Sequence, residues 1–175
     1  MYGRDRDLRA RSEFGRTPSS RITWFQAQQA CGNAGKRLLT NAEWQMAVAG
    51  TPDPGPDNGT SDCNTTFQAG QDPTLAGSRA SCVSARGAFD MVGNLYEWVA
   101  DWVPRSTACG TWSTTVSPMA TADSQCLAGA ATTGEPGALL RGGNFFIGTF
   151  AGPLAVLGSF VPSFASFNFG FRCAR

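Results

Sequence analysis

Cysteine is the chemically most versatile residue type in this sequence, and it occurs at positions 31, 63, 82, 109, 126 and 173. No two of these cysteines form a C-x-x-C pair, so the spacing does not favour a zinc site. An even number of widely spaced cysteines is compatible with three disulfides, and buried free thiols are the alternative. Most cytosolic proteins keep their thiols reduced, whereas intracellular proteins of hyperthermophiles are an exception.

The chain contains no histidine, which removes the commonest general base and the commonest metal ligand. The net charge of +1 gives no indication of a nucleic-acid partner. The one charge-dense stretch, residues 3–16, mixes both signs and is typical of a solvated surface or an edge strand. The N-terminus lacks the apolar core of a signal peptide, so the sequence leaves the location open, with display on a cell or virion as one outcome.

Eight of the twelve phenylalanines lie between Arg141 and Arg175, and no charged residue occurs between Arg141 and Arg172. Glycine, proline, serine and asparagine interrupt this tail, which argues against a membrane span. Phe160, Phe164 and Phe167 follow neither a period of 2 nor one of 3.6. The pattern favours surface loops that expose aromatic rings, and a plain core packing of every ring is the alternative.

Two helices and several short strands would have to position these residues. "TWFQ" at Thr23 and "TNAE" at Thr40 are capping boxes, each followed by apolar residues at helical spacing. Residues 51–86 and 103–137 are expected to be long loops, because proline, glycine and small polar residues dominate them. Strands are expected at residues 95–101, in "ALLRGG" and in "GFRCAR". Together these elements predict a single α+β domain over residues 1–175.

The segments "TWFQAQQACGNAGKRLLTNAEWQMA", "GAFDMVGNLYEWVADW", "LRGGNFF" and "GFRCAR" resemble the formylglycine-generating-enzyme (sulfatase-modifying factor) family, in the family's order. The resemblance implies a C-type-lectin-like fold, with two helices packed on a small twisted antiparallel sheet. Family enzymes carry two catalytic cysteines between "RGG" and "GFR", where this chain has none, and an iron-dependent branch needs histidines. We therefore expect no catalytic activity and no catalytic cofactor. Sugar binding is also disfavoured, because no EPN, QPD or WND triplet is present.

One non-catalytic group with this fold, which the chain resembles, is the variable proteins of diversity-generating retroelements. In those proteins adenine-directed mutagenesis rewrites the segment between "RGG" and "GFR", and asparagine codons are the usual targets. The corresponding variable region here is about residues 141–175. The positions that such codons could reach, and which we predict to bind ligand, are Phe146, Ile147, Phe150, Leu157, Ser159, Phe160, Phe164, Ser166 and Asn168. Phe145 and Phe167 are ambiguous between core and variable surface, whereas Phe169 and Phe171 are expected in the core.

The resemblance also implies a structural calcium ion and a disulfide pairing. The calcium ligands would be the side chains of Asp90 and Glu97 and the carbonyl groups of Gly93 and Leu95, since calcium prefers several oxygen ligands. The alternative is a Gly-Asn turn with a solvated Glu97. The implied disulfides are Cys31–Cys173, Cys63–Cys82 and Cys109–Cys126, one of fifteen possible connectivities.

The sequence thus predicts a non-catalytic protein that binds a variable protein or another macromolecule through its C-terminal surface. The rival hypotheses are an oxidase of the sulfatase-modifying type and a fixed structural or phage-associated domain. Burial of Phe146, Phe150, Phe160 and Phe164 together would contradict the binding surface. The sequence names neither the target nor the oligomeric state.

Overall fold

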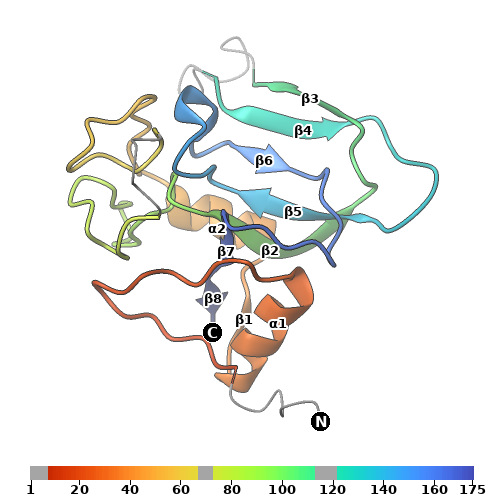
Figure 1. Cartoon of the computed structure of the whole chain (residues 1–175), viewed down its shortest axis with the longest axis horizontal. Coiled ribbons are helices and arrows are strands. Elements are labelled where there is room, and N and C mark those ends of the chain that lie inside the picture. The colour runs from red at the N-terminus through yellow and green to blue at the C-terminus, as the bar shows by residue number, and fades with distance from the viewer. Residues whose placement is uncertain (1–7, 67–72, 113–121) are drawn as a thin grey trace.

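A mixed six-stranded β-sheet organises the computed structural model, which describes residues 8–66, 73–112 and 122–175 (Figure 1). The sheet has the order β3-β4-β6-β5-β2-β7, and β1 and β8 form a separate two-stranded pair. The strands are β1 (Arg37–Leu38), β2 (Tyr96–Val103), β3 (Ala108–Thr111), β4 (Ser124–Ala128), β5 (Gly137–Arg141), β6 (Val156–Leu157), β7 (Phe169–Phe171) and β8 (Cys173–Ala174). A single-turn 3-10 helix, η2, spans Gly148–Phe150.

The expected antiparallel sheet is corrected to a mixed one. The pairs β2–β7 and β4–β6 are parallel, whereas β2–β5, β3–β4, β5–β6 and β1–β8 are antiparallel. Parallel neighbours need long connections, and both parallel pairs here join strands that are far apart along the chain. The crossover segment between β6 and β7 carries the chain past β5 and β2 to the edge of the sheet. The α+β class predicted from the sequence is confirmed.

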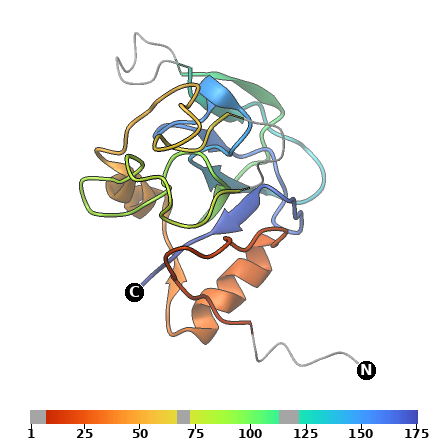
Figure 2. The ribbon, with the colours of Figure 1, turned by 60° about the vertical axis from the view of Figure 1, so that its left-hand side comes forward.

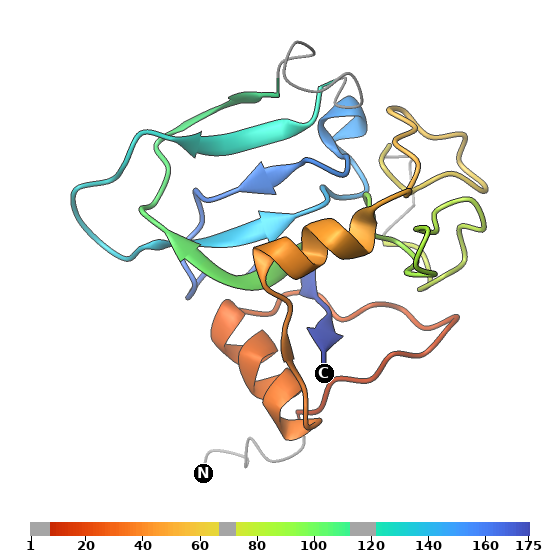
Figure 3. The same cartoon turned by 180° about the vertical axis from the view of Figure 1, so that it is seen from behind.

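The two helices begin where their capping boxes predict. In α1 (Trp24–Asn33) and α2 (Asn41–Val48), the hydroxyl of Thr23 or Thr40 accepts the backbone N–H of the third helical residue, whose side chain bonds back to the cap. Both predictions are therefore confirmed. Seen from behind, α2 lies against β2 (Figure 3), and α1 lies beside β1 (Figures 2 and 3).

Indole N–H groups tie these helices to β2. Trp44 of α2 is fully buried, and its Nε1 donates to Glu97 Oε2 at 2.8 Å. Trp24 of α1 donates to the carbonyl of Val99 at 2.7 Å, and Trp98 donates to the carbonyl of Ile22 at 2.9 Å. Each bond satisfies the polar end of a large ring that the core needs for its volume.

The predicted loop over residues 103–137 is wrong in part, because it contains β3 and β4. Neither strand shows the alternation of apolar residues that a half-buried strand needs, and β3 is exposed along its whole length. The strand expected in "GFRCAR" is also corrected, since it divides into β7 and β8, which belong to different sheets. The loop predicted after α2 is confirmed, because no helix or strand of the described residues lies between α2 and β2.

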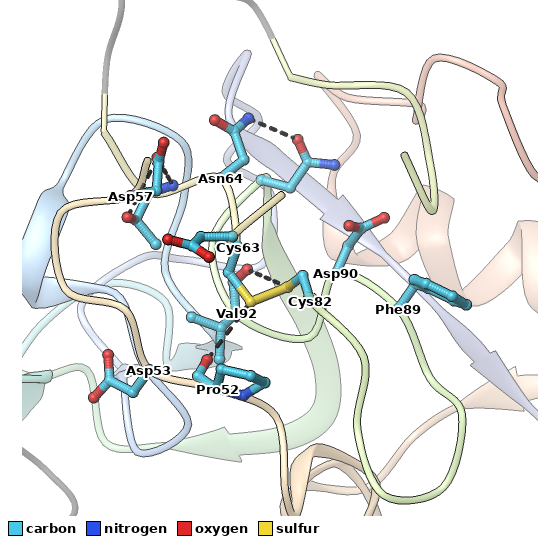
Figure 4. Close-up of a disulfide and its surroundings, with 12 residues drawn as sticks. Pro52, Asp53, Asp57, Cys63, Asn64, Cys82, Phe89, Asp90 and Val92 are labelled. Atoms are coloured by element: carbon cyan, nitrogen blue, oxygen red, sulfur yellow. Dashed lines mark hydrogen bonds between the residues drawn. A yellow bond between two sulfur atoms is a disulfide. The ribbon is translucent and has the colours of Figure 1, made fainter. Parts of the chain in front are cut away.

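All six cysteines form disulfides, in the pairing that the resemblance implied. Cys31–Cys173 joins α1 to β8, and Cys109–Cys126 joins β3 to β4. Cys63–Cys82 closes the long loop between α2 and β2, with both residues fully buried (Figure 4). In the part of the chain that the structure describes, no helix is long and apolar enough to cross a membrane.

Candidate ligand-binding surface

Four phenylalanine rings of the C-terminal segment reach solvent. Phe146, Phe150, Phe164 and Phe167 are 38%, 49%, 43% and 44% exposed. Phe160 is partly buried. Since three of the four rings on which the sequence hypothesis depended are exposed, the outcome that would have contradicted a binding surface is not observed.

Three of the four exposed rings, those of Phe146, Phe164 and Phe167, stand in two clusters, each built on a buried ring. In the first cluster Phe146 and Phe167 stack with centroids 5.7 Å apart, and both contact Phe145, which is 2% exposed. We call Phe145, Phe146 and Phe167 the turn cluster. Because edge-to-face and stacked contacts restrict ring motion, the neighbouring rings hold the exposed rings in place.

The second cluster consists of Phe160, Phe164 and Phe169, and we call it the crossover cluster. Phe160 and Phe164 stack at 5.3 Å, and both meet the edge or face of Phe169, which is 2% exposed and lies in β7. The predicted core position of Phe169 is confirmed. Each cluster thus combines a ring that belongs to the core with rings that face solvent.

Backbone contacts hold the turn that carries the first cluster. Gly143 adopts a φ of +83°, and a Cβ there would lie 2.4 Å from the Cβ of Ala151, so glycine is required. The Asn144 side chain accepts the N–H of Phe146 at 3.0 Å, and the N–H of Gly148 donates to the carbonyl of Thr65 at 2.7 Å. Apart from the buried side chain of Asn144, these contacts use backbone atoms of the turn, so its other side chains can differ without loss of the frame.

The start of α1 holds the segment that carries the second cluster. The N–H of Arg21 donates to the carbonyl of Ser166, and the N–H of Trp24 donates to the carbonyl of Pro162, both at 3.0 Å. On the other side the N–H of Ala138 donates to the carbonyl of Phe160 at 2.9 Å. Here too the bonds to the segment involve its main chain.

The nine predicted binding positions divide into three groups by exposure. Phe146, Phe150 and Phe164 are exposed, while Ile147, Ser159, Phe160 and Ser166 are partly buried. Leu157 and Asn168 are each 7% exposed. Leu157 lies in β6 opposite Leu140 and Cys126, and the carbonyl of Asn168 accepts the N–H of Tyr96. Both are structural in this arrangement, so the surface that we consider below leaves them out.

The structure resolves the two ambiguous rings. Phe145 is core and Phe167 is surface, and the sequence carried no periodic signal that could separate them. A further exposed aromatic pair, Phe25 (49%) and Trp102 (43%), lies outside the tail and was missed. Their rings contact each other and Trp24 edge-on. Phe25 lies next to the apolar face of α1, and this position in the helical pattern is the sequence signal that could have indicated the exposed pair.

Two arginines that flank the segment support it from inside. Arg141 is 4% exposed, donates to the carbonyl of Ala155 at 3.0 Å and lies 4.6 Å from the centre of the Trp44 ring. Burial lowers its pKa to about 10. Arg172 donates to both oxygens of Glu97. The expectation that these arginines hold the scaffold agrees with these contacts.

The turn for which calcium was predicted is filled by Arg172. Its Nη2 and Nε donate to Oε1 and Oε2 of Glu97 at 2.5 and 2.6 Å, and Trp44 donates to the same Oε2. Three of about four acceptor directions of this carboxylate are therefore used. The alternative of a solvated Glu97 is not observed either, since Glu97 is 7% exposed.

Of the other predicted calcium ligands, Asp90 interacts with the same guanidinium. Arg172 donates to the carbonyls of Phe89 and Asp90, and the Asp90 carboxylate accepts the N–H of Gly77 at 2.7 Å. Burial raises the pKa of Asp90. A guanidinium bound to Glu97 on both oxygens supplies the positive charge that a calcium ion would supply. The residues as arranged therefore do not fit a calcium ion that uses Glu97 as a ligand.

Comparison with known proteins identifies relatives by sequence. The family described as "Sulfatase-modifying factor enzyme 1-like domain" matches residues 3–175. A formylglycine-generating enzyme of Thermomonospora curvata is 32% identical over 117 residues, which cover 58% of this chain and 37% of that protein. The serine/threonine-protein kinase pkn1 of Chlamydia caviae is 30% identical over 93 residues, 51% of this chain and 14% of the kinase. The chain thus spans well under half the length of these curated relatives.

Solved structures share the fold. The Major Tropism Determinant M1 variant superposes with a TM-score of 0.58 at 19% identity, covering 86% of this chain and 36% of that chain. Treponema denticola variable protein 1 superposes with a TM-score of 0.53 at 16% identity, covering 94% of this chain and 74% of that chain. The predicted C-type-lectin-like fold is confirmed.

Proposed function

The chain belongs to the family of sulfatase-modifying factor enzyme 1-like domains, and we propose the following function for it within that family. It is a non-catalytic protein that binds variable, chiefly protein, targets through its C-terminal aromatic surface, and a diversity-generating retroelement varies that surface. The surface comprises Phe146, Ile147, Phe150, Ser159, Phe160, Phe164, Ser166 and Phe167.

The observation that carries the proposal is the pair of ring clusters on an uncharged segment. Phe146, Phe164 and Phe167, which are 38–44% exposed, sit on buried rings, and main-chain hydrogen bonds hold the segments that carry them. Contiguous exposed aromatic surface marks interaction sites, and preordered aromatic anchors bind with a small entropic cost. The absence of charge between Arg141 and Arg172 favours an apolar protein surface as target.

Cysteine chemistry is disfavoured by the state of the thiols. All six cysteines of the sequence are in disulfides, so none offers a thiolate for oxidation of a substrate cysteine. The sequence also has no histidine for an iron or copper centre. These observations support a binding role over the oxidase.

Likeness to proteins whose names mark them as variants gives independent support. Major Tropism Determinant is represented by its P3c, M1, U1 and I1 variants, and the Treponema protein is called variable protein 1. A frame that holds its C-terminal segment by main-chain bonds is suited to tolerate such variation.

Sequencing this locus in many isolates tests the diversification. We expect substitutions to cluster between codons 144 and 169 and to match adenines of a nearby template repeat beside a reverse transcriptase gene. They should spare the codons of Leu157 and Asn168 more than those of exposed positions, because both side chains are buried. Codons as constant as those of α1 and α2, without a template repeat, would show a fixed surface instead.

The oxidase remains the second candidate because a relative 32% identical over 117 residues is a formylglycine-generating enzyme. Incubation with copper and a cysteine-containing peptide decides between them. Mass spectrometry of the peptide detects the result, and conversion of the peptide's cysteine would contradict the non-catalytic proposal.

A further inference from the structure

Two aspartates from distant parts of the chain meet beneath the turn that carries Phe146 and Phe150. Asp53 follows α2, and Asp123 precedes β4. Their side chains interact with each other. Asp123 is 0% exposed, and its Oδ1 and Asp53 Oδ2 are both buried without another hydrogen-bond partner.

The surroundings of this pair contain little to neutralise two negative charges. Asp123 Oδ2 accepts the N–H of Leu154 at 2.6 Å, and the N–H of Gly55 points to Asp53 Oδ1 at 3.5 Å. In the described part of the chain, Arg141 of β5 is a charged group that interacts with Asp123. Its guanidinium is bonded to carbonyl groups of residues 153–155 and to Gln45, not to either carboxylate.

We propose that Asp53 and Asp123 share one proton, and that this proton holds the loop of residues 51–66 against the segment of residues 148–155. Loss of the proton leaves two carboxylates in contact and loosens the turn between them. Phe146 and Phe150 on that turn then become mobile, whereas the crossover cluster stays in place.

Contacts on both sides of the pair link it to that turn. On the side of Asp53, Gly55 lies against the side chain of Thr149, and the carbonyl of Thr65 accepts the N–H of Gly148. On the side of Asp123, the carboxylate holds Leu154, and Gly152 lies so close that a Cβ there would be 2.1 Å from Asp123 Oδ1. In Figure 4 the Asp53 carboxyl group points away from the Cys63–Cys82 disulfide.

The direction of the pH effect follows from the cost of charging a buried acid. Burial raises the pKa of Asp123 to about 6, and repulsion from Asp53 adds to the shift, while the Leu154 N–H opposes it. Burial also raises the pKa of Asp53. For both aspartates the pKa in the folded chain lies above the pKa in the unfolded chain, so low pH favours the closed turn. Stability is lost as pH rises from about 4 through about 6.

The consequence for ligands rests on the proposed function. Targets that bind the turn cluster should bind more weakly above about pH 6, and targets that bind the crossover cluster should not respond. The structural step can be tested without any target, so failure of one proposal can be distinguished from failure of the other.

Hydrogen exchange of the intact chain, followed by mass spectrometry and corrected for intrinsic rates, tests the step. Between about pH 5 and about pH 7.5, peptides over residues 144–156 should lose about tenfold in protection, as expected for a carboxyl group whose pKa is about 6 in the folded chain and about 4 in the unfolded chain. Peptides of α1 should show no such change. Calcium is omitted in one series and added in a second.

Two variants mimic the protonated pair. Asp123→Asn keeps an oxygen for Leu154 and offers an N–H to Asp53, and Asp53→Asn offers an N–H to Asp123. Both should remove the pH dependence of residues 144–156, and either suffices if the other fails to fold. Glu135→Gln is the matched control, since Glu135 is exposed and bonds Ser163. It should behave as the wild-type chain.

Three results would overturn the proposal. The first is equal protection of residues 144–156 at both pH values in the wild-type chain. The second is an unchanged pH dependence in both asparagine variants. The third concerns added calcium at about pH 7.5. If calcium restores full protection of residues 144–156 in the wild-type chain but not in Asp123→Asn, a cation and not a proton occupies the pair.

Discussion

At the scale of single residues, the exposed phenylalanines are expected to supply most of the binding energy. Phe146→Ser and Phe164→Ser each remove one ring from a different cluster, so each should weaken binding of a target selected on that cluster by about tenfold or more. Calorimetry or biolayer interferometry measures the loss. Phe14→Ser is the control, because Phe14 is 78% exposed and lies outside the C-terminal segment. Equal effects of all three substitutions would contradict a localised surface.

Arg172 is expected to be the residue whose loss the frame tolerates least. Arg172→Met leaves the Glu97 carboxylate buried with one remaining donor, Trp44, and should lower the free energy of unfolding by about 3–5 kcal/mol. Urea denaturation measures it. Arg37→Met, which breaks the exposed pair with Glu43, should change little.

Calcium provides a second readout at the same residue. If the guanidinium supplies the positive charge at Glu97, calcium and a chelator should leave the melting temperature of the wild-type chain unchanged. A melting temperature that falls on chelation would show that an ion is bound at this turn or elsewhere.

At the scale of elements, the turn after β5 depends on a glycine. Gly143→Ala combines a left-handed backbone, which costs about 1–2 kcal/mol, with a Cβ too close to Ala151. Gly87→Ala has a similar φ of +78° and no atom within 4 Å of its new Cβ, so it carries the conformational cost alone. Gly143→Ala should therefore destabilise the chain more than Gly87→Ala in urea denaturation. Equal losses would mean that the turn shifts to accept the methyl group.

The crossover between β6 and β7 shows how an irregular element becomes a usable surface. It has little secondary structure of its own, yet bonds to α1 and β5 fix its main chain at both sides. Its rings gain order from Phe169, which is part of the sheet. An irregular segment held in this way can present side chains that contribute nothing to the frame.

At the scale of the whole molecule, the disulfides restrict the unfolded chain to different extents. Cys31–Cys173 spans 142 residues, whereas Cys63–Cys82 and Cys109–Cys126 span 19 and 17. The loop-entropy relation gives about 5 kcal/mol for the first and about 3 kcal/mol for each of the others. Paired Cys→Ala variants, compared by urea denaturation, should follow this order. A smaller loss for Cys31–Cys173 would show that residual structure already brings α1 and β8 together in the unfolded chain.

The sequence alone determined the features that depend on short-range chemistry. Capping boxes located the starts of both helices, because the cap and its partner are three residues apart. Family resemblance extended this to the fold and the disulfides. The uncharged tail indicated an exposed aromatic surface before any ring could be placed.

Tertiary structure decided what depends on neighbours far along the chain. Phe145 and Phe167 differ in exposure, and Leu157 and Asn168 are buried, because of strands that pack against them from other parts of the sequence. The same holds for β3 and β4, whose residues carry no apolar alternation, and for Arg172 beside Glu97, 75 positions apart. Asp53 and Asp123 meet for the same reason, since burial and contact between distant residues leave no local pattern in the sequence.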